Sequence, residues 1–145
     1  MNNTKNEGYN NAGLFCSLKD AIVDNLVIDS SCSFTGYNAG ALSVSVDGSL
    51  TVKHTTNSAA VSGRFSVGGF IGLVQGMEQP TVVSFDGCVN HGNVTASGND
   101  VGGFVWVICN NANIVMTFFN SINNGNVTGG YSVGGLVGCI YSTSD

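Results

Sequence analysis

The sequence offers few residues that could perform acid–base catalysis. Enzymes with a parallel β-helix that cleave polysaccharides use clustered carboxylates, often beside calcium or a basic residue. The densest acidic group here is Asp20, Asp24 and Asp29, and no arginine or histidine lies close to it in the sequence. Such a group is more typical of solvated turns than of an active site. We therefore predict no catalytic residues and expect that the protein is not an enzyme.

The histidines and cysteines also lack the spacing of a catalytic or metal site. His54 and His91 have no marked partner, and no GxSxG serine is present. No two of the five cysteines form a CxxC pair, which argues against zinc and redox motifs. Their odd number leaves at least one thiol unpaired. We expect most of them to be small buried residues, with a disulfide or an interchain bond as the alternative. The Gly-Gly pairs precede apolar residues, unlike the calcium-binding GGxGxD repeat, so neither metal nor cofactor is expected.

Composition and charge restrict the partners. The net charge is −5 and only four cations are spread along the chain, so no basic patch can bind nucleic acid or an anionic membrane. No apolar run approaches the roughly 20 residues that span a bilayer. The first residues lack the apolar core of a signal peptide. The protein is thus either not secreted or a piece of a longer chain, and we favour the second interpretation.

Internal repeats in the sequence indicate the strands and turns that would position these side chains. A hydrophobic fraction of 43% with 9% charged residues is globular rather than disordered, and Val, Ile, Thr, Gly and Asn favour strands and turns. The glycine unit Ser66–Gly72 returns at 100–106 and 132–138, with weaker copies at 37–42 and 10–15. Its second glycine is expected at Gly13, Gly40, Gly69, Gly103 and Gly135, which are 27 to 34 residues apart.

Two further elements recur in the same order. The asparagine unit 90–95 matches 123–128 and, earlier, 57–62. Between the glycine and asparagine units lies a β-prone run at 81–85, which matches 114–118 and 50–52. Each repeat therefore holds three short β-prone runs separated by Gly or Asn turns, as one coil of a stacked solenoid requires.

The predicted fold is all-β, a three-faced parallel β-solenoid of about 4–5 coils. It forms a single repeat domain, 1–145, with coils at about 9–36, 37–65, 66–99, 100–131 and 132–145. Right-handed coiling is expected because parallel crossovers prefer that hand. Stacked coils would align Val61, Val94 and Val127 in one inward row, and Phe85 and Phe118 with Val52 in another. An antiparallel β-sandwich is the alternative, but it does not require a three-part repeat at a near-constant interval.

Some repeat positions have specific expected roles. Gly68, Gly69, Gly102, Gly103, Gly134 and Gly135 are predicted turn glycines that need either positive φ or close backbone approach. Asn57, Asn90 and Asn123 are predicted to stack at a corner as a hydrogen-bonded ladder. Trp106 replaces a repeat glycine and is either core filling or an exposed platform for sugar. Asn93 and Asn126, like Asn2, lie in glycosylation sequons, although we favour turn chemistry as the reason for the repeated Asn-Val-Thr.

These units resemble the GLUG motif, a Gly-Gly-Leu-Val-Gly core followed by a β-run and Asn-x-Gly-x-Val. Gly135–Gly138 matches the core, Gly69–Gly72 is a conservative variant, and Trp106 departs from it at the last position. The resemblance covers about the last 80 residues well and implies an extracellular, modular surface protein or adhesin.

We therefore expect a non-enzymatic structural or adhesive repeat segment of a cell-surface or extracellular protein. Its partners would be its own copies, stacked end to end into filaments, or neighbouring repeats of a longer chain, or a surface glycan or protein. A carbohydrate-binding or carbohydrate-active β-helix module is the alternative.

Overall fold

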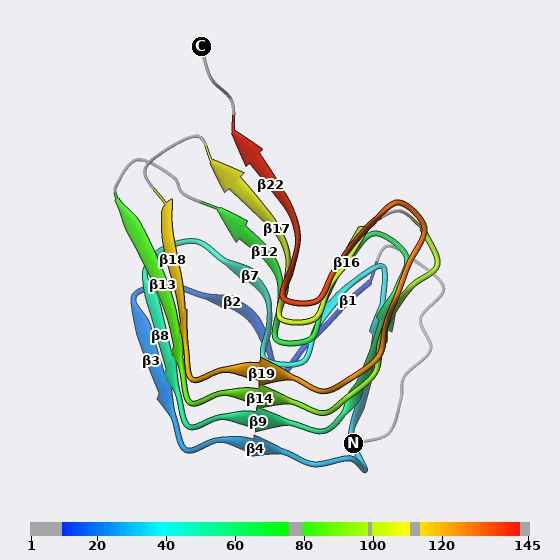
Figure 1. Ribbon diagram of the computed structural model, residues 1–145, viewed down its shortest axis with the longest axis horizontal. Coiled ribbons are helices and arrows are strands. Elements are labelled where there is room, and N and C mark those ends of the chain that lie inside the picture. Colours follow the sequence, from blue (N-terminus) through cyan, green and yellow to red (C-terminus); the bar gives the residue numbers. More distant parts are fainter. Residues whose placement is uncertain (1–9, 76–79, 99, 111–113, 143–145) are drawn as a thin grey trace.

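The computed structural model describes residues 10–75, 80–98, 100–110 and 114–142. This part of the chain is all-β and contains strands β1 to β22 without a helix. All the strand pairs that join one coil to the next are parallel. Every fifth strand joins the same sheet, so the protein is a parallel β-solenoid (Figure 1).

The strands follow one another in the same order in each coil. The first coil contains β1 (Asn11–Ala12), β2 (Phe15–Leu18), β3 (Ala21–Asp24), β4 (Val27–Ile28) and β5 (Ser33–Gly36). The second contains β6 (Asn38–Gly40), β7 (Ser43–Val46), β8 (Leu50–Lys53), β9 (Thr56–Asn57) and β10 (Ala60–Gly63). The third contains β11 (Ser66–Gly68), β12 (Ile71–Gln75), β13 (Thr81–Asp86), β14 (Val89–Asn90) and β15 (Val94–Ala96). The fourth contains β16 (Asp100–Gly102), β17 (Val105–Asn110), β18 (Ile114–Phe119), β19 (Ile122–Asn123) and β20 (Val127–Thr128), and β21 (Ser132–Gly134) and β22 (Val137–Ser142) begin a fifth.

Five sheets replace the three faces expected from the sequence. The glycine unit bends and supplies two strands per coil, such as β11 and β12, and the asparagine unit likewise supplies β14 and β15. Only the middle run, such as β13, remains a single strand. Figure 1 shows the bend of the glycine unit dipping toward the sheet of β4, β9, β14 and β19. The cross-section is therefore divided into two lobes.

Each lobe has its own apolar core. In the first, three phenylalanines come together, with ring centroids of Phe70 and Phe104 4.8 Å apart and those of Phe85 and Phe104 5.2 Å apart. The second contains smaller side chains, mainly valine and alanine from the strands on either side of the coil boundary. Aromatic pairs of this kind add about 0.5–1.5 kcal/mol each beyond the area they bury. The core of the first lobe therefore gains stability that the smaller side chains of the second do not supply.

The predicted inward rows are confirmed by the register. Val61 pairs with Val94 and Val94 with Val127, all within one sheet. Phe85 pairs with Val52 on one side and with Phe118 on the other, and the two phenyl rings stack 5.3 Å apart. Equivalent apolar residues therefore lie directly above one another, because the parallel register places each repeat on its own copy.

The alignment of the two early glycines was wrong by one residue. Gly40 pairs with Gly68, and the pairing of Ala12 with Ala39 brings Gly13 level with Gly40. The first glycine of the unit is therefore kept in all coils, and Ala41 and Leu14 take the place of the second. Burial explains the shift, because this register places Ala39 in the core position of Val67.

Candidate functional site

The paired glycines mark a bend through close backbone approach. A Cβ atom on Gly68 would overlap the carbonyl oxygen of Ile71, and one on Gly69 would overlap that of Gly103 in the next coil. The same overlaps recur at Gly102, Gly103 and Gly134. None of these glycines has positive φ. Of the two predicted reasons for glycine, close approach is therefore the one that applies.

The three ladder asparagines lie between the two lobes. Asn57 Nδ2 donates to Asn90 Oδ1, and Asn90 Nδ2 donates to Asn123 Oδ1, both at 2.8 Å. Each amide also donates to the backbone two residues ahead, as Asn90 does to Gly92 O at 2.9 Å. Asn57 Nδ2 additionally lies 3.3 Å from Gly69 O, across the core. The ladder thus ties the inward glycine bend to the opposite sheet.

Burial makes these bonds necessary. Asn57 and Asn90 are fully buried, and a buried amide without partners costs about 1–3 kcal/mol per unsatisfied group. Stacking equivalent asparagines solves this, because the central Asn90 amide accepts from Asn57 and donates to Asn123. In the first coil Ile28 takes the ladder position instead.

A second column, which the sequence reasoning missed, forms the left-handed corner. We use this name for Asn25, His54, Gly87 and Asn120, whose φ values are 56°, 46°, 64° and 46°. The register of the preceding strands stacks all four at one corner. Asparagine and glycine directly after a β-run were the available signal, since both adopt this conformation readily.

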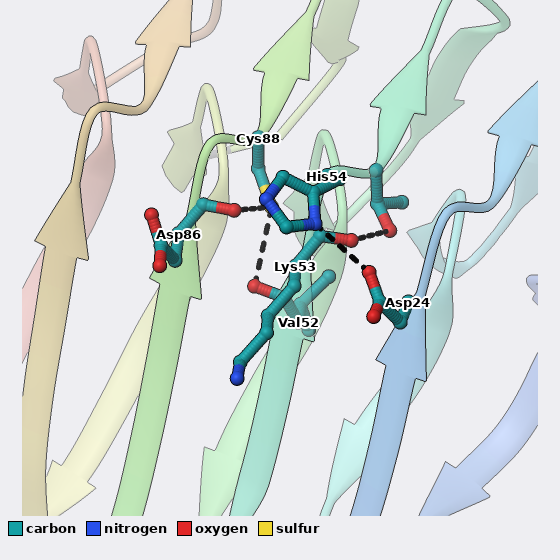
Figure 2. Close-up of polar contacts among 7 residues, drawn as sticks. Asp24, Val52, Lys53, His54, Asp86 and Cys88 are labelled. Carbon is teal, nitrogen blue, oxygen red and sulfur yellow. Dashed lines mark hydrogen bonds and ion pairs between the residues drawn. The ribbon is translucent and has the colours of Figure 1, made fainter.

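After three of the four corner positions, the side chain of the next residue secures the turn. Thr55 Oγ1 donates to Lys53 O, Cys88 Sγ to Asp86 O and Ser121 Oγ to Phe119 O, in each case two residues back. Figure 2 shows this corner around His54, with dashed lines from Cys88 to the backbone of Asp86 and Val52. A small side chain with a donor therefore recurs in these three coils, whereas Leu26 follows Asn25 in the first coil.

The corner brings together Asp24, His54 and Cys88, residue types found in hydrolytic sites. His54 Nδ1 lies 3.0 Å from Asp24 Oδ1, but the side chains are 60% and 46% exposed. An exposed pair of this kind contributes at most about 1 kcal/mol. Cys88 is fully buried, its thiol donates to Val52 O at 3.3 Å, and burial raises its pKa. A protonated, inward-directed thiol is a poor nucleophile, so the arrangement is that of a structural turn.

The acidic residues noted in the sequence do not converge. Asp20 Oδ1 accepts from Ser49 N at 3.2 Å, and Asp29 Oδ1 accepts from Ser31 N at 2.9 Å. Hydrogen bonds from Ser31 lower the pKa of Asp29. These carboxylates therefore serve separate turns. Among the described residues, no group of three or more His, Cys, Asp or Glu side chains is placed to hold a metal.

The cysteines differ in exposure. Cys88 is buried and Cys32 packs against the second core, whereas Cys16 is exposed and Cys139 is half-buried. The expectation that most cysteines are buried is therefore wrong for the four that the structure describes. All four are free thiols. The side chain of Cys109 lies outside the described residues.

Trp106 is not an open platform. Its side chain is half-buried, and Nε1 is buried without a hydrogen-bond partner in the described part of the chain. By strand register, Trp106 lies between Gly72 of the preceding coil and Gly138 of the following coil. A shielded indole nitrogen cannot donate to a sugar hydroxyl, so the geometry favours gap filling beside the two glycines.

The two repeated sequons share one surface. Asn93 and Asn126 are exposed, as are Thr95 and Thr128, and Asn126 N donates to Asn93 Oδ1 at 3.1 Å. Adjacent coils lie about 4.8 Å apart, so glycans on both asparagines would crowd one another. The sequon at Asn2 lies outside the described residues.

No family model, curated protein or solved structure matches this chain. The resemblance to GLUG repeats therefore stays a prediction. In the described ranges no helix is long and apolar enough to cross a membrane.

Proposed function

We propose that the protein is a non-enzymatic structural or adhesive repeat segment of an extracellular or cell-surface protein. The observation that carries the proposal is that polar side chains recur once per coil instead of converging on one point. The hydroxyl file, our name for outward residues Thr35, Ser62, Thr95 and Thr128, runs in register along one sheet. Repetition of one chemical group along a rigid surface suits multivalent attachment or spacing rather than catalysis.

The contacts between successive coils support a mechanical role. The two cores run through successive coils, and the asparagine ladder joins the second, third and fourth coils through side chains as well as strand pairing. The resemblance to GLUG repeats also implies an extracellular or cell-surface location. A stiff array of this kind presents its lateral surfaces at fixed spacing.

A bead-adhesion assay tests the proposal. Beads carrying the protein should attach to surfaces coated with glycans, matrix proteins or the protein itself, and the triple change of Thr35, Thr95 and Thr128 to alanine should reduce that attachment. The matched control changes the outward hydroxyls of another sheet, which lie in register on β8, β13 and β18: Thr51, Ser84 and Thr117. Equal attachment by both variants would remove the hydroxyl file from the proposal. Turnover of any substrate in a hydrolase panel would contradict a non-enzymatic role.

End-to-end assembly into filaments is a further form of this structural role. Negative-stain electron microscopy over a concentration series, checked by light scattering, tests it. Rods of uniform width that lengthen with concentration would support filaments, whereas particles of constant length would argue against them.

A further inference from the structure

One corner of the solenoid contains an extra residue in the second coil. This corner joins the sheet of β5 and β10 to the sheet of β6 and β11. Tyr37 alone connects β5 to β6, whereas Arg64 and Phe65 connect β10 to β11. The carbonyl oxygen of Tyr37 accepts from Arg64 N at 3.1 Å and from Phe65 N at 2.9 Å. Two residues therefore oppose one, as in a β-bulge, and bulges redirect the side chains that they carry.

The bulge brings two aromatic rings together on the lateral surface. The ring centroids of Tyr37 and Phe65 lie 4.8 Å apart, and the ring planes are inclined by 28°. We call this pair the aromatic corner. Phe65 remains 41% exposed in spite of the contact, whereas Phe70 and Phe85 of the first core are fully buried. The corner therefore presents aromatic surface to solvent in the middle of the chain.

Polar groups border the aromatic corner on both sides. Thr35 and Ser62, the first two residues of the hydroxyl file, precede it, and their hydroxyl groups share a hydrogen bond of 3.0 Å. Hydroxyls paired in this way retain lone pairs for a ligand. Asn38 follows the corner, donates to Asn11 Oδ1 at 2.9 Å and accepts from Ser66 N at 3.3 Å. Aromatic surface beside hydroxyl and amide groups suits a pyranose ring, which has an apolar C–H face and a polar edge.

The single arginine of the chain lies at the same corner. Arg64 is exposed, and no carboxylate lies within ion-pair distance of it in the described part of the chain. Asp100 pairs with Ser66 in the register, but its Oδ1 accepts from Ser132 N of the following coil at 3.2 Å. A guanidinium without a carboxylate partner is suited to bind the carboxylate of a ligand through two parallel hydrogen bonds.

We propose that the aromatic corner and Arg64 bind a hexuronic acid unit of a glycan. The C–H face of the sugar would lie on Phe65, its hydroxyls would bond to Thr35 and Ser62, and its carboxylate would accept from Arg64. An acidic peptide would use the arginine but has no flat apolar ring for Phe65. The inference rests on the proposed adhesive function and names the chemical class of its ligand.

Titration calorimetry with the full chain tests the inference. The probes are hexamers of galacturonic acid and of glucuronic acid, each compared with its methyl ester. At least one acid should bind ~10-fold more tightly than its ester, because esterification removes the charge that pairs with Arg64. Added salt should weaken the binding of the acid, since an exposed ion pair is screened.

Protein variants locate the site. Phe65→Ala should weaken binding about 10-fold, whereas Phe15→Ala, which removes a phenylalanine of matched exposure (42%) from β2, should leave binding unchanged. Arg64→Gln should bind acid and ester equally, and Lys53→Gln, at another exposed cation, should keep the preference for the acid. Melting temperatures check that each variant folds, and Arg64→Gln stays informative because its side chain is exposed.

The outcomes separate this inference from the proposed function. No binding of either acid, equal binding of acid and ester, or unchanged binding by Phe65→Ala or Arg64→Gln would overturn the inference. Hexaglutamate binding as tightly as the hexuronates would overturn it in favour of an acidic peptide. Beads that still attach to matrix proteins or to the protein itself would then leave the adhesive function standing, whereas loss of all attachment would remove that function as well.

Discussion

Removal of the central ladder amide should destabilise the protein strongly. Asn90→Ala deletes three hydrogen bonds: those with Asn57 Nδ2, Asn123 Oδ1 and Gly92 O. At about 1 kcal/mol each, with a further cost for the buried groups left unpaired, we expect a loss of about 3–5 kcal/mol. That is a large part of the roughly 5–15 kcal/mol by which domains are stable.

Urea denaturation followed by circular dichroism measures this loss. Asn124→Ala is the matched control, because Asn124 is exposed on the equivalent turn of the next coil and should change stability by less than about 0.5 kcal/mol. Asn90→Leu separates packing from hydrogen bonding, since an apolar residue, Ile28, occupies the ladder position of the first coil. A loss below about 1 kcal/mol for Asn90→Ala, or full stability of Asn90→Leu, would refute the reasoning. A lowered slope with denaturant would indicate that the coils no longer unfold together.

Four other expectations can be measured directly. Gly87→Ala should cost about 1–2 kcal/mol in thermal or urea unfolding, because Gly87 has a φ of 64°; no change would argue against the left-handed corner. A thiol reagent should modify exposed Cys16 at least ~100-fold faster than buried Cys88, read by mass spectrometry, since Cys88 reacts only after opening. The lowered pKa of Asp29 means that its carboxylate stabilises the fold above its ordinary value of 3.8 and loses this effect as pH falls through the folded pKa. Asp29→Asn should therefore flatten the acid limb of the stability profile, and an unchanged limb would contradict this. Trp106→Ala should leave glycan-array binding unchanged, whereas lost binding would support the carbohydrate module.

The fold class could be predicted because a parallel solenoid places each repeat on its own copy. The spacing of Asn57, Asn90 and Asn123, and the apolar residues at Val61 and Val94, gave the register that the structure has. Early coils were harder, because Gly40 is followed by Ala41 and the single glycine fits two alignments. Only burial of Ala39 in the second core distinguishes them.

Side-chain chemistry was less accessible to sequence reasoning. The left-handed corner combines Asn, His and Gly, so no single residue type marks it, and its backbone conformation is set by the turn between two stacked sheets. Trp106 looked unusual in sequence, yet its exposure depends on the strands around it.

Parallel stacking, the order of the three repeat units and the in-register rows can be inferred from the sequence, because they follow from local periodicity. The inward turn of the glycine bend, which divides the coil into five sheets and two cores, cannot. Close approach of Gly69 to the next coil and to the buried ladder depends on residues from other coils and from the opposite sheet. Such packing between distant segments has no counterpart in the spacing of residues along the chain.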